Sequence, residues 1–138
     1  MINLFQSSLP SARRISGGKY QKVLHFDGKE EIEEYIRAKN IPAAYLDAGF
    51  YMTNFQYFFP PFALPDGTVV FSTPMKEDTV VPLIDIPSDF GKIAFAMIKG
   101  GLAQFKGKHV LASSGYISMK DVVATFAKGK PISFSLLE

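Results

Sequence analysis

The chain has 138 residues, of which 47% are hydrophobic and 20% are charged, so its composition is that of a globular protein of one modest domain. A net charge of +2 is too weak to argue for nucleic-acid binding. The absence of cysteine excludes disulfides and thiol catalysis, and two isolated histidines argue against a transition-metal site.

The amino-terminal segment favours folded structure over a targeting signal. It lacks acidic residues and contains serine and arginine, which resembles a mitochondrial presequence in composition. However, Pro10 and the pair Gly17 and Gly18 would break the amphipathic helix that such a signal needs. The most apolar run, residues 93–98, is far too short to span a bilayer, so we expect no association with a membrane.

The first elements in chain order read as strand, helix and strand. Residues 2–6 are a short apolar run, residues 25–37 have helical periodicity, and residues 43–50 form a second buried strand. Asn40 and Pro42 are expected to end the helix. A unit of this kind predicts two parallel strands with any ligand beyond their carboxyl ends. Two segments of the sequence would meet there, beside the start of the helix: Ser7 with Ser8, and the loop 51–54.

The start of this helix allows two interpretations. His25, Lys29, Ile32 and Ile36 share one helical face, which we take as the inward stripe, with the glutamates on the opposite side. In one interpretation Asp27 is the N-cap, which leaves His25 in a loop and Lys29 in a solvated turn. In the other, the helix begins before His25, and its first inward turn faces a ligand that bears hydroxyls or phosphates.

The rest of the chain continues the alternation of helices and strands. Residues 50–62 are rich in aromatics without a clean period, which favours core or lid packing over ligand stacking. Local signals next predict a hairpin that turns at Pro65, Asp66 and Gly67, followed by an extended segment at 80–87. A helix should then begin at Ser88 or Asp89 as its cap and end at Gly100 and Gly101. After a strand at 108–113, we expect a helix capped by Ser118 and closed by Gly129 and Pro131, and a last strand at 132–137.

Several motifs, in this order and spacing, resemble the NmrA-like family of atypical short-chain dehydrogenases/reductases. They are "SSLP", "GKY", "HFDGKEEIEEYIR", "NIP" and "YMTN". The resemblance implies an α/β fold, the carboxyl-terminal part of a Rossmann-type NAD(P)-binding domain with a smaller subdomain. Residues 1–56 would be the end of the Rossmann sheet, and residues 57–138 would be mainly that subdomain.

The resemblance also implies a site. Typical reductases of the superfamily use Tyr-x-x-x-Lys, and here the same spacing joins His25 to Lys29. Lys29 would contact the nicotinamide ribose of NADP or NAD, and Tyr51, Met52, Thr53 and Asn54 would line the nicotinamide end. Ser7, Ser8 and His25 are further candidates. Because His25 replaces the tyrosine, no catalytic residue is assigned, although an imidazole can still donate a proton.

One part of the family pattern is missing. The sequence contains no glycine-rich phosphate loop of the GxxGxxG kind, because neither Gly17-Gly18 nor Gly100-Gly101 has the required spacing. The resemblance therefore begins near the fifth strand of the family's sheet, and we expect a partial domain, either a natural short product or a truncated one. Such a chain would bind NADP or NAD weakly or not at all, and its unpaired sheet edge would favour homodimers or aggregation.

These expectations leave three functions open. The first is a regulator that senses the redox state of the nicotinamide pool and acts through a protein partner, such as a transcription factor, in the cytoplasm or nucleus. The second is an NAD(P)H-dependent oxidoreductase. The third is a remnant that binds no ligand. Turnover of quinones or aldehydes would separate the second from the first.

Overall fold

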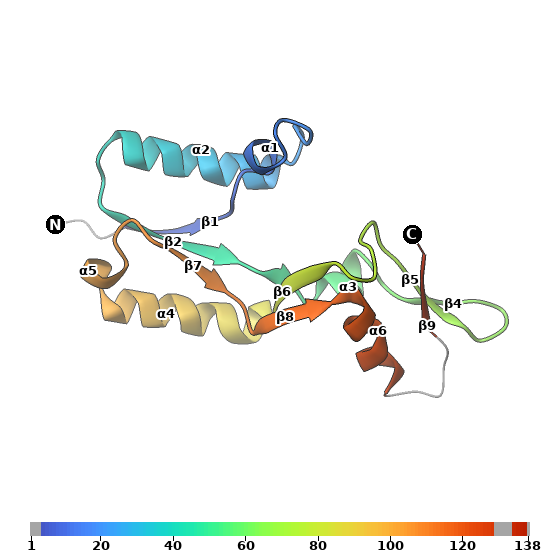
Figure 1. Ribbon diagram of the computed structural model, residues 1–138. Helices are drawn as coiled ribbons and strands as arrows, with labels where there is room; N and C mark the ends of the chain where they lie inside the picture. Colours follow the sequence, from blue (N-terminus) through green and yellow to red (C-terminus); the bar gives the residue numbers. More distant parts are fainter. Residues whose placement is uncertain (1–3, 129–133, 138) are drawn as a thin grey trace. The chain divides into compact units, whose positions relative to one another are not determined.

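The computed structural model describes residues 4–128 and 134–137, the last four by their backbone (Figure 1). The chain folds into two compact units that alternate along the sequence. Unit 1 comprises 1–48 and 87–112, and unit 2 comprises 49–86 and 113–138. The division expected from the sequence is contiguous, whereas these units are not, because the chain returns to unit 1 for its third strand.

Unit 1 is built on a parallel sheet in the order β1-β2-β7, formed by β1 (Leu4–Ser8), β2 (Ala43–Ala48) and β7 (His109–Ala112). The first two strands pair in parallel, as the sequence predicted. β2 is buried along residues 43–46, which is typical of a parallel strand covered on both faces. The helices of this unit are α1 (Ala12–Ile15), α2 (Leu24–Ala38), α4 (Gly91–Gly100) and α5 (Leu102–Phe105). In Figure 1, α2 and α4 lie on opposite faces of the sheet.

Helix α2 begins before His25, as the second interpretation of its sequence expected. The helix begins at Leu24, and its N-cap is Val23, which makes no side-chain capping bond. Asp27 therefore lies within the helix and is not its cap. At the other end, Asn40 has a φ of 54°, and the amide of Ile41 donates to the carbonyl of Ile36 at 3.1 Å. The predicted end of the helix at Asn40 is therefore confirmed.

The start of α4 differs from the prediction. A π-helical turn, η1 (Ile86–Phe90), precedes it, and its N-cap, Phe90, makes no side-chain bond. Neither Ser88 nor Asp89 caps the helix, because both lie inside the π-helical turn. The predicted end is confirmed, since Gly101 follows the helix with a φ of 79°, a conformation in which glycine carries no side-chain penalty.

Unit 2 contains two small sheets. One has the order β3-β6-β8, from β3 (Phe50–Tyr51), β6 (Val80–Ile84) and β8 (Gly115–Ser118), and the other has the order β4-β5-β9, from β4 (Phe62–Ala63), β5 (Val69–Ser72) and β9 (Phe134–Leu137). The predicted hairpin is confirmed: β4 and β5 are antiparallel, and Gly67 turns between them with a φ of 86°. The helices of this unit are α3 (Asn54–Tyr57) and α6 (Met119–Ala127).

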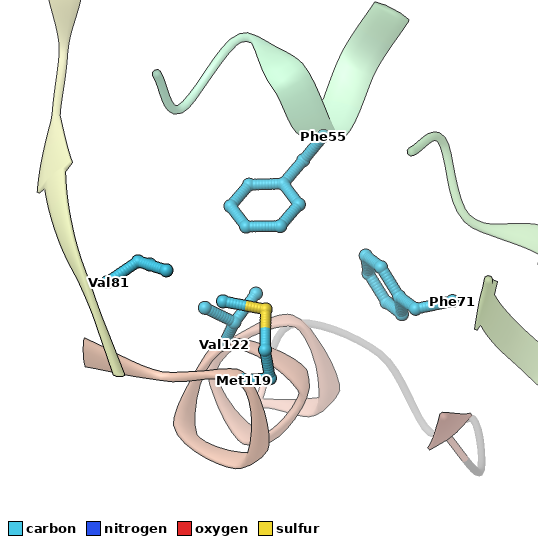
Figure 2. Packing of buried hydrophobic residues seen from close by; sticks show 5 residues of the cluster. All are labelled: Phe55, Phe71, Val81, Met119 and Val122. Carbon is cyan, nitrogen blue, oxygen red and sulfur yellow. The ribbon is translucent and has the colours of Figure 1, made fainter. Parts of the chain in front are cut away.

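Helix α6 begins at its predicted cap. The Ser118 hydroxyl accepts a bond from the amide of Asp121 at 3.1 Å. The proposed closure of this helix by Gly129 and Pro131 lies outside the described residues. The helix packs into the apolar core of unit 2, whose buried members are shown in Figure 2: Phe55, Phe71, Val81, Met119 and Val122.

The aromatic stretch that precedes this core divides between the interior and the surface. Phe55 is buried and Phe50 packs against it, with ring centroids 5.5 Å apart. Tyr57 and Phe58 are instead both 75% exposed. The expectation of core packing therefore holds for only part of the stretch.

Candidate functional site

Lys29 lies at the carboxyl end of β1, beside Ser7. Its Nζ donates to Ser7 Oγ at 2.8 Å and to the Ser7 carbonyl at 3.1 Å. The side-chain amide of Gln6 donates to the backbone carbonyl of Lys29 at 2.8 Å. Two successive residues of the strand thus hold this turn of α2 by direct hydrogen bonds. The result is an ammonium group at the edge of the sheet where ligands of parallel α/β folds bind.

The other two candidates of unit 1 differ in exposure. His25, one helical turn before Lys29, is exposed, and its ring packs edge-on against Phe26 with centroids 4.8 Å apart. Ser8 is fully buried, and its hydroxyl donates to Glu33 Oε2 at 3.0 Å between α2 and the sheet. Ser8 therefore joins the helix to the strand, while Ser7 and His25 present polar groups outward.

The inward face of α2 is not the stripe that we expected. Its buried residues are Asp27, Glu30, Glu33 and Ile36, whereas Ile32 is 55% exposed. The prediction that the glutamates lie opposite the buried face is wrong for two of them. The physical reason is that each buried carboxylate has a partner from another element, so its burial is compensated.

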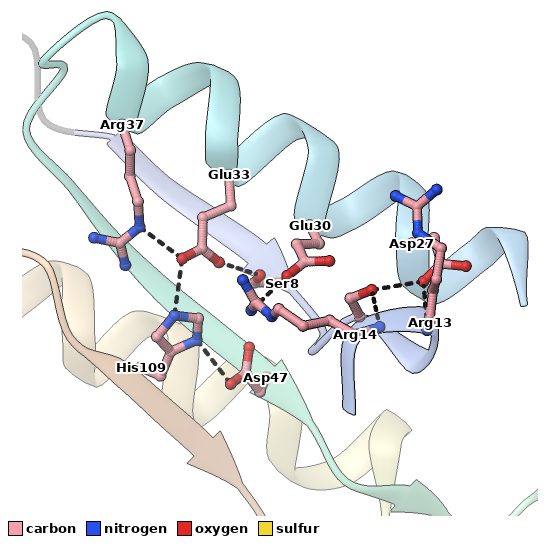
Figure 3. A network of polar contacts seen from close by, with 10 residues as sticks. Ser8, Arg13, Arg14, Asp27, Glu30, Glu33, Arg37, Asp47 and His109 are labelled. Carbon is pink, nitrogen blue, oxygen red and sulfur yellow. Dashed lines mark hydrogen bonds and ion pairs between the residues drawn. The ribbon is translucent and has the colours of Figure 1, made fainter. Parts of the chain in front are cut away.

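Glu33 is the centre of one such set of contacts (Figure 3). Its carboxylate accepts bonds from Arg37 Nε at 2.8 Å and from Ser8, and it contacts Nε2 of His109 at 3.0 Å. Nδ1 of His109 lies 2.9 Å from Asp47 Oδ2. Burial alone would raise the pKa of Glu33, but the bonds from Arg37, Ser8 and His109 outweigh it, and the pKa is lowered.

Asp27 holds the short helix α1 against α2. Its Oδ1 accepts a bond from the backbone amide of Arg13 at 3.2 Å and from the hydroxyl of Ser11 at 2.9 Å. The amide bond from Arg13 is the main cause of a lowered pKa for Asp27. One turn further along α2, Glu30 forms an ion pair with Arg14 of α1. The buried carboxylates of α2 are thus structural groups.

Sequence reasoning missed these carboxylates, although a signal was present. Asp27, Glu30, Glu33 and Ile36 recur every three residues, so each lies beside the next on the helix surface, although the row as a whole winds around the helix. An apolar stripe is the usual choice for the buried face. Only the partners from β1, α1 and β7 reveal that the acidic face is buried here.

The remaining candidates belong to unit 2. Tyr51 ends β3, and the amide of Met52 donates to the Ile84 carbonyl at 2.9 Å. Thr53 is the N-cap of α3, which begins at Asn54. Tyr51 and Met52 are 39% and 37% exposed, so both side chains are accessible to a ligand. Their approach to Lys29 stays a prediction.

Within the described part of the chain, no group of three or more histidine, aspartate or glutamate side chains is arranged to hold a metal ion. No helix among the described residues is both long enough and apolar enough to cross a membrane. A cavity of about 210 Å³ lies on the α4 face of unit 1, and β1 contributes Phe5, Gln6 and Ser7 to its wall. The polar edge at Ser7 thus adjoins an apolar hollow.

The parallel sheet with helices on both faces defines a class of protein, the Rossmann-type α/β proteins. The sequence pattern of the NmrA-like family matches residues 2–136, so the chain belongs to this family. Solved structures of NmrA, a negative transcriptional regulator, share the fold with a TM-score of 0.83. One is a complex with NADP and another a complex with NAD; they are 23% and 24% identical to this chain and cover 99% of it.

Two curated relatives come from fungi. The nitrogen metabolite repression protein nmrA of Emericella nidulans is 27% identical over 115 residues, which are 80% of this chain and 33% of that protein. The nitrogen metabolite repression protein nmr of Neurospora crassa is 24% identical over 113 residues, which are 77% of this chain and 23% of that protein. The chain therefore spans a third or less of the length of these curated relatives.

Proposed function

We propose that this chain is the ribose-contacting part of an NmrA-like NAD(P)-binding regulator, with Lys29 as the contacting residue. The whole regulator would sense the redox state of the nicotinamide pool and act on transcription through a protein partner, such as a transcription factor, in the cytoplasm or nucleus. Relatives with the same fold support this proposal, because NmrA is a negative transcriptional regulator solved with NADP and with NAD.

The observation that carries the proposal is the position of the Lys29 ammonium. A lysine ammonium has three donor hydrogens, and the two bonds to Ser7 use two of them. The third remains for a ribose hydroxyl, which accepts hydrogen bonds. When bound, the nicotinamide cofactor would supply reversible hydride transfer, while the protein contributes binding and orientation.

The donor set fits one end of the dinucleotide better than the other. Lys29, Ser7 and the exposed His25 offer partners for hydroxyls, whereas the 138-residue sequence contains no glycine-rich loop for the pyrophosphate. We therefore expect weak binding by this chain. Tyr51, Met52, Thr53 and Asn54 complete the proposed site at the nicotinamide end.

An oxidoreductase is the second candidate, favoured by the exposed His25 one turn before Lys29. A protonated imidazole at this position would be a proton donor in place of the usual tyrosine.

A second copy of this chain is another candidate partner. Among the described residues β1 pairs only with β2, and its other edge has no strand beside it.

The test is a titration of the isotopically labelled chain with NADP and with NAD, followed by amide chemical shifts, which detect weak binding. We expect shifts at Ser7, His25, Lys29 and the 51–54 segment. Lys29→Ala should weaken the binding by about 1–3 kcal/mol, the value of a charge-assisted hydrogen bond, or abolish it. Lys22→Ala, at an exposed position before α2, is the matched control.

Four results discriminate between the candidate functions. Equal binding by the Lys29→Ala chain would show that Lys29 is not part of the site. If no amide shifts at a high nucleotide concentration, the chain is a remnant that binds no ligand. Turnover of quinones or aldehydes with NADPH, lost on His25→Ala, would favour the oxidoreductase. Nucleotide binding without turnover supports the regulator.

A further inference from the structure

A half-buried serine follows the only pair of adjacent arginines in the sequence, and both arginines are exposed. The segment reads Arg13-Arg14-Ile15-Ser16, and it covers the single turn of α1 and its C-cap. No residue of α1 is buried, and Ile15 is 72% exposed. Two guanidinium groups therefore stand two and three positions before a hydroxyl, on a surface that another protein can reach.

Only local bonds hold the hydroxyl of Ser16. Its Oγ donates to the Arg13 carbonyl at 3.2 Å and accepts from the Tyr20 amide at 3.0 Å, both in exposed positions. Gly17 and Gly18 follow with φ values of 61° and 89°. The turn of α1 buries none of its own residues, so the bonds to Asp27 and the Arg14–Glu30 ion pair are what hold it, and opening them lets this segment extend into the cleft of an enzyme.

We propose that Ser16 is a phosphorylation site for a serine/threonine kinase that selects arginines before its acceptor. Carboxylates in the cleft of such a kinase would pair with the guanidinium groups of Arg13 and Arg14. The Ser16 oxygen forms a bond to the γ-phosphorus of magnesium-bound ATP, and the bond from that phosphorus to the bridging β–γ oxygen breaks. ADP leaves, and the hydroxyl proton passes to the base of the kinase.

The contacts of Arg14 give the phosphate a structural consequence. Arg14 pairs with Glu30, and the two side chains are 70% and 9% exposed. A phosphoserine two positions after Arg14 is a doubly charged competitor for the same guanidinium. When Arg14 turns to the phosphate, Glu30 keeps its burial but loses its cation. Phosphorylation therefore loosens α1 from α2, one residue away from Lys29.

This consequence links the modification to the ribose site, and that link rests on the proposed function. The modification itself does not, because it needs only the exposed segment and its two arginines. A phosphorylated chain that binds no nucleotide would still confirm the kinase site. The two proposals can therefore fail separately.

The test incubates the folded chain with magnesium-ATP and the catalytic subunit of cyclic-AMP-dependent protein kinase, and locates phosphate by peptide mass spectrometry. We expect one phosphate, on Ser16, and none in Ser16→Ala. Replacing both Arg13 and Arg14 by alanine should lower the initial rate about tenfold or more, as for the loss of a charged hydrogen bond. Lys22→Ala should leave the rate unchanged.

Three outcomes would overturn the proposal. They are phosphate on another residue, an unchanged rate in the double arginine variant, and phosphorylation of a peptide spanning 10–22 while the folded chain stays unmodified. Hydrogen exchange reports the structural consequence: amides of 12–15 and 24–30 should exchange faster in the phosphorylated chain. Unchanged exchange would show that Arg14 keeps Glu30 as its partner.

Discussion

Nε2 of His109 lies 3.0 Å from Oε1 of Glu33, a contact that joins strand β7 to helix α2 across 76 positions of the chain. The other ring nitrogen of His109 contacts Asp47 on β2. An ionised carboxylate only accepts hydrogen bonds, so both contacts are hydrogen bonds only when the imidazole carries both of its protons. The ring thus connects a helix and two strands.

Replacing His109 should destabilise unit 1. In His109→Phe, a ring of similar shape faces two carboxylates without a donor, and we expect the free energy of unfolding to fall by about 1–3 kcal/mol. Urea denaturation measures this change. Lys108→Ala is the control, because this neighbouring side chain is exposed. Equal effects of the two substitutions would argue against the histidine contacts.

Acid should unfold the chain through the carboxylates of α2. The hydrogen bonds to Asp27 and Glu33 hold both pKa values below their usual range in the folded state. A lowered folded pKa adds stability above the unfolded pKa, and that stability is lost as the pH falls through the folded value. We therefore expect urea midpoints to fall between about pH 5 and about pH 2.

Glu33→Gln should flatten this pH dependence, although it lowers stability at neutral pH. The matched control is Glu34→Gln, because Glu34 is exposed and adjacent on the same helix. Urea midpoints measured for both variants across the acid range make the comparison. If the urea midpoints of both variants fall with pH as steeply as those of the parent chain, Glu33 is not the source of the acid sensitivity.

Two isoleucines of α2 should respond differently to truncation. Ile36 is 5% exposed and Ile32 is 55% exposed, although the sequence stripe placed both inward. We expect Ile36→Ala to lower the free energy of unfolding by about 2–5 kcal/mol, the usual range for a buried isoleucine. Ile32→Ala should change it by no more than about 0.5 kcal/mol. If denaturant titrations showed Ile32→Ala to be the more destabilising substitution, the buried face of α2 would be the stripe predicted from the sequence.

The aromatic residues of unit 2 allow a similar comparison. Phe71 is 2% exposed within the core shown in Figure 2, and Phe58 is 75% exposed. Phe71→Ala should cost about 3–5 kcal/mol, because a large cavity replaces the ring. Phe58→Ala should leave the thermal midpoint almost unchanged. Calorimetry of the two variants tests whether the aromatic residues of unit 2 divide between core and surface as described.

The sequence predicted the elements that depend on local signals. Asn40 ends α2, Asp66 and Gly67 form the hairpin turn, and Ser118 caps α6, since each signal acts within a few residues. The parallel pairing of β1 with β2 also followed from the strand–helix–strand order.

The predictions that failed concern features that depend on residues distant in the sequence. The buried face of α2 could not be chosen from its own periodicity, because Glu33 is buried only with His109 and Ser8 beside it. In the same way, the π-helical turn displaced the predicted cap of α4. The sequence placed Ser7 and Ser8 together beside the start of α2, and it could not separate exposed Ser7, which contacts Lys29, from buried Ser8.

The interleaved units determine the order in which a growing chain can fold. β1, α2 and β2 leave the ribosome before unit 2 does, and β7 follows only after the whole 49–86 segment of unit 2. Until β7 arrives, β2 lacks one of its two neighbours and Glu33 lacks His109. At synthesis rates of about 5–20 residues per second, this half-built sheet persists for seconds, long enough for a chaperone to bind it.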